Sequence, residues 1–169
     1  MRRTLIIIGL ALIVGMFVIF TNRNQQLQNN SLQNVADARV PAKAVPFTKL
    51  AYGPHSVVTK RVNYLITSPT ELSELWHLVD AKGKIPSVDF TQNEVIAVFA
   101  GQQPTTNYAV TVSKVQDSSA RMISIMFKNP SSNCASQNAV IAPYEIIVVP
   151  TTSLPITHEN ISTTTTCLE

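Results

Sequence analysis

The strongest constraint on this chain is an uninterrupted apolar run from Leu5 to Phe20, which follows the basic pair Arg2 and Arg3. A helix of about 16 residues covers about 25 Å, close to the lower limit for crossing the hydrocarbon core of a bilayer. Because basic residues favour the cytoplasmic side, the sequence predicts a membrane-spanning helix over residues 4–20, with the rest of the chain outside the cytoplasm. The anchor residues are Leu5, Ile6, Ile7, Ile8, Leu10, Leu12, Ile13, Val14, Phe17, Val18, Ile19 and Phe20.

A cleavable signal peptide is the main alternative, because it also has a basic start and an apolar segment. Such a segment usually has about 7 to 15 residues and ends at a small-x-small cleavage site. No such site follows Phe20, and Ala36-Asp37-Ala38 lies too far beyond the run. We therefore predict an uncleaved single-pass anchor in a bacterial cytoplasmic membrane, with the C-terminal part on the periplasmic or extracellular side.

The net charge of +3 does not indicate a nucleic-acid partner, because the basic residues gather near the N-terminus. Up to Lys49 there are six basic residues and one acidic residue, whereas the remainder has seven basic and nine acidic residues. That remainder has no stripe of lysine and arginine interleaved with aromatic residues, which is the usual signature of nucleic-acid binding. The basic N-terminal part is instead suited to a position near acidic lipid headgroups.

The composition divides the rest of the chain into three parts. Residues 21–46 are rich in Asn and Gln and have no apolar periodicity, which is typical of a flexible linker. Residues 47–158 are predicted to form one domain, large enough to enclose a core without depending on disulfides. Residues 159–169 are expected to be a threonine-rich tail, with residues 162–166 disordered.

One helix is predicted after Ser68–Glu71, which supplies an N-cap serine, a proline at the first helical position and a capping-box glutamate. Leu72, Leu75, Trp76 and Val79 then follow at helical spacing and form one apolar stripe. Lys82-Gly83-Lys84 is the expected end of the helix. A single apolar stripe indicates that this helix packs onto a sheet.

Strand signals rich in β-branched and aromatic residues occur at residues 56–66, 94–101, 108–115, 121–128 and 144–149. A short polar turn between the third and fourth of these predicts an antiparallel hairpin. The predicted fold class is therefore α+β and mainly antiparallel β. We expect a small curled sheet, barrel- or sandwich-like, covered by one helix and preceded by the transmembrane helix.

Five segments occur in an order and spacing that resemble a known family. They are Val88–Thr91, Glu94–Val98, Gly101–Tyr108, Pro130–Cys134 and Pro143–Tyr144. The chain is similar here to the PrcB C-terminal domain family, over residues from about 47 to 150. The founding members are accessory subunits of a surface protease complex. The resemblance implies a domain that binds and stabilises a partner protein, with an envelope or secreted protease as one candidate.

The resemblance also suggests contact surfaces, namely the loops at 101–108 and 129–138 together with exposed sheet edges. The family's turn carries two glycines before the tyrosine, where this chain has Thr106-Asn107. The candidate partner-binding residues are Gly101, Pro104, Thr105, Asn107, Tyr108, Asn133 and Tyr144. A small-ligand module for carbohydrate or peptide is the alternative, in which Tyr52, Tyr64, Tyr108 and Tyr144 supply an aromatic pocket.

No catalytic, cofactor or metal site is predicted. His55, His77 and His158 do not stand at a metal-ligating spacing, and no nucleophile elbow or phosphate-binding loop occurs. His77 is interpreted as a residue on the flank of the helix. Cys134, in a polar loop, could meet a histidine through the fold, so an unrecognised hydrolase stays open as a third alternative.

Two further pairs have alternative readings. Cys134 and Cys167 could form a disulfide outside the cytosol, closing a loop of roughly 34 residues and stabilising the domain by about 3 to 4 kcal/mol. Against this, Cys167 stands close to the end, where order is least expected. Asp89 and Glu94 could bind a cation, but the favoured interpretation is that Asp89 caps a turn.

Overall fold

The computed structural model describes residues 41–132, 134 and 139–165. The predicted membrane anchor, most of the predicted linker, Asn133 and Cys167 lie outside these residues. No helix in the described part is long and apolar enough to cross a membrane. Pro41 begins the compact unit that is described below.

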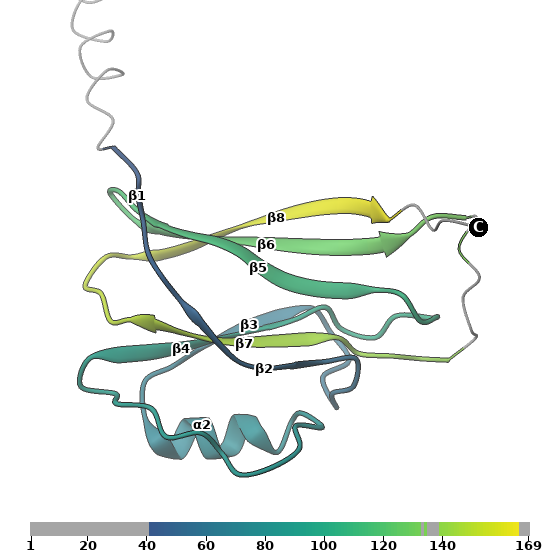
Figure 1. The fold of residues 1–169 in the computed structure, drawn as a ribbon, viewed down its shortest axis with the longest axis horizontal. Helices are drawn as coiled ribbons and strands as arrows, with labels where there is room; N and C mark the ends of the chain where they lie inside the picture. The colour runs from purple at the N-terminus through teal and green to yellow at the C-terminus, as the bar shows by residue number, and fades with distance from the viewer. Residues whose placement is uncertain (1–40, 133, 135–138, 166–169) are drawn as a thin grey trace, which may run out of the picture. The chain divides into compact units, whose positions relative to one another are not determined.

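The described residues form eight strands and one helix, arranged as two sheets with the helix against one of them (Figure 1). One sheet has the strand order β1-β5-β6-β8 and the other β2-β7-β4-β3. All neighbouring strands are antiparallel except β6 and β8, which are parallel. The elements are β1 (Lys43–Ala44), β2 (Thr48–Gly53), β3 (Val62–Ile66), α2 (Pro69–Trp76), β4 (Asn93–Phe99), β5 (Ala109–Asp117), β6 (Arg121–Pro130), β7 (Tyr144–Pro150) and β8 (Ile156–Thr165).

Two apolar layers hold these elements together. Ile96, Ile125 and Ile147 belong to the layer between the two sheets. Leu72 and Leu75 of α2 belong to the second layer, on the outer face of the β2-β7-β4-β3 sheet. Because β4 lies between both layers, its residues from 94 to 99 are buried on both faces. This explains why the sequence of β4 is continuously apolar after Glu94 instead of alternating.

The predicted start of the helix is confirmed. The Ser68 side chain accepts a hydrogen bond from the Glu71 N–H at 3.3 Å, and Pro69 is the first helical residue. Glu71 in turn accepts from the Thr67 N–H at 2.7 Å, so the capping glutamate reaches one residue further back than expected. The helix ends at Trp76, well before Lys82. Residue 79, which the apolar stripe placed in the helix, instead forms a β-bridge with Ser56.

The structure confirms an α+β fold that is mainly antiparallel, with a β5–β6 hairpin, but it corrects three details. The strands form two open sheets instead of one small curled sheet, which is the sandwich-like and not the barrel-like of the two expected forms. The first predicted strand, residues 56–66, is regular only from Val62. Three strands were not predicted, namely β1, β2 and β8.

The expectation of a disordered segment at 162–166 is wrong for residues 162–165, which belong to β8. Threonine and isoleucine are β-branched and favour extended backbone, and β6 supplies the hydrogen-bonding partner that sequence reasoning could not see. At the other end, residues 43–45 fall inside the predicted linker. They are nevertheless bound to β5, and the Val45 N–H donates to the Val115 carbonyl at 2.9 Å.

Candidate functional site

The loop at 101–108 begins at a glycine that the fold requires. Gly101 is buried with φ of 73°, a left-handed conformation that side chains rarely adopt. A Cβ there would lie 2.8 Å from the Arg61 nitrogen and 2.9 Å from the Thr59 oxygen. The next residue, Gln102, donates its N–H to that Thr59 oxygen at 3.0 Å. Gly101 therefore fixes the start of the loop and does not present a side chain to a partner.

The turn before Tyr108 is formed by Asn107, whose φ is 75°. Asparagine tolerates this conformation better than most residues, so it replaces the glycine that the resemblance places there. Thr106 does not share the positive φ, since Asn107 is the one non-glycine residue in the described part that has it. Asn107 therefore supplies the left-handed residue of this turn.

Tyr108 and Tyr144, two of the predicted contact residues, line one cavity of about 320 Å³ together with Tyr52. Tyr52 projects from β2 and is 73 % exposed, whereas Tyr144 is 2 % exposed. The Tyr144 ring stacks on Phe99, with ring centroids 6.1 Å apart. Tyr144 thus forms a rigid wall, and Tyr52 is the aromatic side chain that is available to a partner.

The absence of a side chain at Gly53 leaves space for the Tyr144 ring. Gly53 and Tyr144 are paired residues of neighbouring β2 and β7. A Cβ on Gly53 would lie 3.1 Å from the Tyr144 ring. The Tyr144 hydroxyl has its pKa raised, chiefly by burial and to a lesser extent by the negative charge of Asp80. The phenol therefore stays neutral at physiological pH.

A second hollow, of about 560 Å³, shares Tyr52 and Tyr144 with the first. Its lining also includes Trp76 at the end of α2, and the Trp76 indole N–H is buried without a hydrogen-bond partner in the described part of the chain. Lys49, Lys82, Lys84 and Asp80 surround it. We call the two hollows together the tyrosine surface, defined by Tyr52, Trp76, Tyr108, Pro143 and Tyr144.

The remaining candidates are dispersed. Tyr64 is 38 % exposed, packs edge-on against Phe99 with ring centroids 5.8 Å apart, and lines a different cavity from Tyr108. Pro104 is exposed and Thr105 half-buried, in a loop held by the Gln103 N–H bond to the Ile141 carbonyl at 2.7 Å. Neither residue lines the tyrosine surface.

Cys134 is buried and disulfide-bonded, so it offers no free thiol for nucleophilic chemistry. Its backbone N–H donates to Ser131, and the Ser131 N–H donates to the Thr165 carbonyl at 3.1 Å. The end of β8 therefore lies beside the loop that carries Cys134. In sequence, Cys167 follows Thr165 by two residues, and its pairing with Cys134 stays a prediction.

Asp89 caps a turn, as expected: its carboxylate accepts from the N–H and the hydroxyl of Thr91, at 3.0 and 2.6 Å. The hydroxyl bond is the first cause of its lowered pKa. Glu94 points elsewhere and pairs with Arg121 at 3.1 Å. Within the described ranges, no three His, Cys, Asp or Glu residues gather in a way that could hold a metal ion. His77 is the C-cap of α2, on the flank of the helix as interpreted.

Two buried charge networks were not foreseen. Arg121, 2 % exposed, holds Asp117 through two hydrogen bonds of 2.8 Å and also binds Glu94 and the Pro150 carbonyl. Glu145, also 2 % exposed, binds groups on both sheets. Glu145 interrupts the otherwise apolar β7, and that interruption was the available signal. Arg121 is the first residue of β6, where a charged side chain gives no such signal.

Comparison with known proteins gives one match. The family model described as PrcB C-terminal matches residues 95–150. The matched range runs from β4 to the end of β7 and contains the loop at 101–108, Pro143 and Tyr144. No match was found among curated proteins or among solved structures. The resemblance seen in the sequence motifs is thereby confirmed: residues 95–150 match the PrcB C-terminal family.

Proposed function

We propose that this protein is an accessory protein whose domain binds and stabilises a partner protein outside the cytoplasm, with an envelope or secreted protease as the first candidate. The observation that carries the proposal is the PrcB C-terminal match, which covers the loop at 101–108 and Tyr144. In this proposal the chain contributes binding alone, and any chemistry belongs to its partner.

The tyrosine surface is the proposed contact. Tyrosine and tryptophan are enriched among the residues that dominate binding energy at protein interfaces, because they bury a large area at a small entropic cost. Tyr52 supplies an exposed ring beside the rigid wall of Tyr144. Lys82 and Lys84 add positive charge at the second hollow of this surface. A partner with an acidic or carbonyl-rich segment is complementary to this arrangement.

The apolar run at 5–20 supports a membrane location for the proposed complex. A helix there would hold the domain on the outer side of a cytoplasmic membrane, and the following residues would give it reach. Cell fractionation of the full chain tests this part. Recovery in the membrane fraction, with the domain open to added protease in spheroplasts, is expected; recovery in the cytosol contradicts it.

Co-purification tests the contact. The full chain, solubilised in mild detergent after cross-linking in cells, is expected to recover a partner protein in stoichiometric amount. Tyr52→Ser should reduce that recovery at least about tenfold, as for a residue that dominates an interface. Tyr64→Ser is the matched control, since Tyr64 is also exposed but lies outside the tyrosine surface. Equal recovery with both variants contradicts the assignment of this surface.

A small-ligand module is the second candidate, favoured by the hollow of about 560 Å³ and by the Trp76 indole N–H, which has no hydrogen-bond partner among the residues that the structure describes. The volume lies within the range of about 300 to 1,000 Å³ that is common for ligand sites. Thermal-shift measurements with envelope saccharides and short peptides distinguish the candidates. A clean monomer that is stabilised by a saccharide favours the ligand module over the accessory role.

A further inference from the structure

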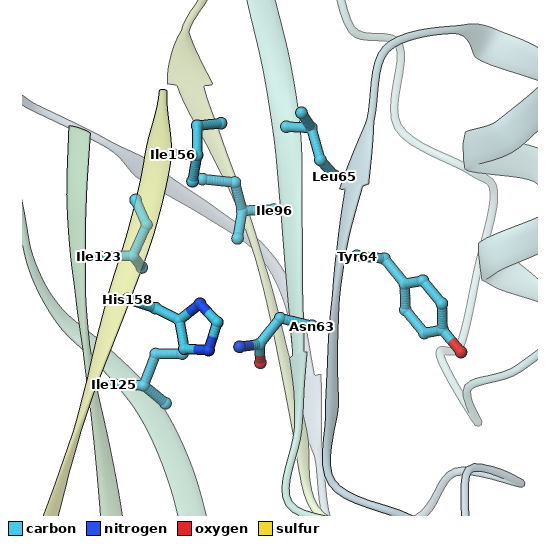
Figure 2. A pocket seen from close by; sticks show the side chains of 8 residues that line it. All are labelled: Asn63, Tyr64, Leu65, Ile96, Ile123, Ile125, Ile156 and His158. Carbon is cyan, nitrogen blue, oxygen red and sulfur yellow. The ribbon is translucent and has the colours of Figure 1, made fainter. Parts of the chain in front are cut away.

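A separate cavity of about 240 Å³ opens between the two sheets, on the side of the sandwich where β3 faces β8 (Figure 2). Its apolar lining includes Ile96, Ile123 and Ile125, each at most 4 % exposed, together with Ile156. Two polar side chains also line it, Asn63 from β3 and His158 from β8. Figure 2 shows the Asn63 amide turned toward the His158 imidazole.

The topology explains why the sandwich is open here. Both β3 and β8 are edge strands, each paired on one side only. Val62 and Ile66 pack in the layer under α2, so the alternation of the strand turns Asn63 toward the opposite sheet. His158 lies in register with Ile123, a residue of the layer between the sheets, so it also lies on the inner face. Polar residues thus stand where large apolar side chains would close the gap.

The Asn63 side chain has one buried atom that lacks a hydrogen bond within the described part of the chain. Its Oδ1 atom is buried and has no hydrogen-bond partner among the described residues. Buried polar atoms in folded proteins almost always have a partner, and an orphan calls for an explanation. In Figure 2 the nitrogen of the Asn63 amide is the atom nearer His158. The χ2 torsion of asparagine is broad, so rotation about it can turn the oxygen toward the cavity instead. An acceptor beside an apolar cavity is the arrangement that recognises a ligand with one donor group.

We propose that this cavity binds a small neutral molecule that has one apolar ring and one hydroxyl or N–H group, and that the donor group pairs with Asn63 Oδ1. The volume is below that of drug-sized sites, which limits the ligand to about one ring. The isoleucine lining disfavours a charged ligand, because an ion would lose its hydration there. His158 lies at the polar end of the site, opposite the amide. This site is distinct from the tyrosine surface and does not depend on the proposed partner.

The experiment uses p-cresol as the probe, with 4-methylanisole and toluene as matched compounds that cannot donate a hydrogen bond. The full chain, in detergent micelles and labelled at the isoleucine δ1 methyl groups, is titrated and followed by NMR. We expect p-cresol to shift the methyl signals of Ile96, Ile123, Ile125 and Ile156 in a saturable way. The Ile146 methyl, buried on the α2 side of the sheet, is the internal control for micelle effects. The two matched compounds should bind at least about tenfold more weakly, because the acceptor then stays unpaired.

Two variants assign the effect to the amide. Asn63→Leu removes the acceptor, so the affinity of this variant for p-cresol should fall to the affinity of the wild type for toluene. Thr157→Leu is the control, since Thr157 belongs to β8 but lies on the face of the strand opposite to His158, in register with Met122, and does not line the cavity. This variant should bind p-cresol as the wild type does. The proposal is overturned by the absence of saturable shifts, by equal binding of p-cresol and 4-methylanisole, or by unchanged binding in Asn63→Leu. The comparison of the three compounds on the wild type stands even if a variant fails to fold.

Discussion

The Glu145 carboxylate on β7 accepts a hydrogen bond from the Val112 N–H on β5 at 2.8 Å, and so links the two sheets through the core. The register of β5 against β6 shifts between Val112 and Lys114. The Thr111 hydroxyl and the Lys49 ammonium also donate to Glu145, at 2.9 and 2.8 Å. Both oxygens of this buried carboxylate therefore have hydrogen-bond donors, as buried polar groups in folded proteins require.

Glu145→Leu is expected to lower the free energy of unfolding by about 3 kcal/mol, because it leaves the buried Val112 N–H without an acceptor. Urea denaturation of the detergent-solubilised protein, followed by Trp76 fluorescence, measures this loss. Lys49→Met is the control. The Lys49 side chain is half exposed, so its ion pair should contribute only about 1 kcal/mol or less. Equal losses in both variants would mean that the ion pair, and not the backbone contact, matters most.

The free energy of unfolding at acid pH should depend on Asp117. Hydrogen bonds from Arg121 hold the pKa of this carboxyl below its ordinary value of 3.8. A lowered pKa in the folded state gives stability that is present above the unfolded pKa and is lost as the pH falls through the folded pKa. Asp117→Asn should therefore lose less stability than the wild type between about pH 5 and about pH 2. Urea midpoints across this range provide the measurement.

Glu94 should change the stability at acid pH in the direction opposite to Asp117. Burial raises its pKa above the ordinary value of 4.5, and the nearby Arg121 charge only partly offsets this. A carboxyl with a raised pKa makes the folded state relatively more stable as the pH falls, since the folded protein takes up the proton first. Glu94→Gln removes this gain, so the free energy of unfolding of this variant should fall more steeply than that of the wild type as the pH is lowered. A shallower profile in this variant would contradict the assignment.

Gly101→Ala should destabilise the domain strongly, by about 2 kcal/mol or more, because the new Cβ meets backbone atoms at 2.8 to 2.9 Å in a left-handed conformation. Gly83→Ala is the matched control. Gly83 also has a positive φ, but nothing lies within 4 Å of its Cβ position. It should therefore show only the conformational cost of about 1 kcal/mol. Thermal unfolding by circular dichroism compares the two, and a similar loss in both would remove steric contact as the cause.

Reduction of the disulfide at Cys134 should lower the free energy of unfolding by about 3 to 4 kcal/mol, as the chain-entropy model gives for a loop of roughly 34 residues. Urea denaturation with and without reductant measures the difference. Cys134→Ser and Cys167→Ser should reproduce it to the same extent if these two cysteines pair. Unequal losses in the two variants, or a wild type indifferent to reductant, would show that they do not.

Local signals predicted local structure well. Ser68 and Pro69 marked the start of the helix, because capping depends on residues only a few positions apart. The polar turn before Arg121 predicted the hairpin for the same reason. The segment from Ser162 to Thr165 was misread, because its pairing partners are the residues from Phe127 to Pro130, which stand 35 positions earlier in the chain. Composition alone could not reveal that partner.

The candidate sites depended on tertiary structure to a greater degree. Tyr108 and Tyr144 were chosen from motifs, and the fold places them in one cavity with Tyr52. Tyr64 lines a different cavity, since it belongs to β3, at the edge of the sheet opposite to the β2 strand that carries Tyr52. No sequence pattern joins Asn63 to His158, which are brought to one cavity by the facing of β3 and β8.

The sequence by itself determined the apolar N-terminal run, the capped helix, most of the strands and the family match, since all of these depend on residues that are near one another in the chain. The tertiary structure decided which strands became edges, which glycines and carboxylates were buried, and which side chains came to share a cavity. Those outcomes depend on contacts between distant segments, and such contacts form only when the two sheets and the helix pack together.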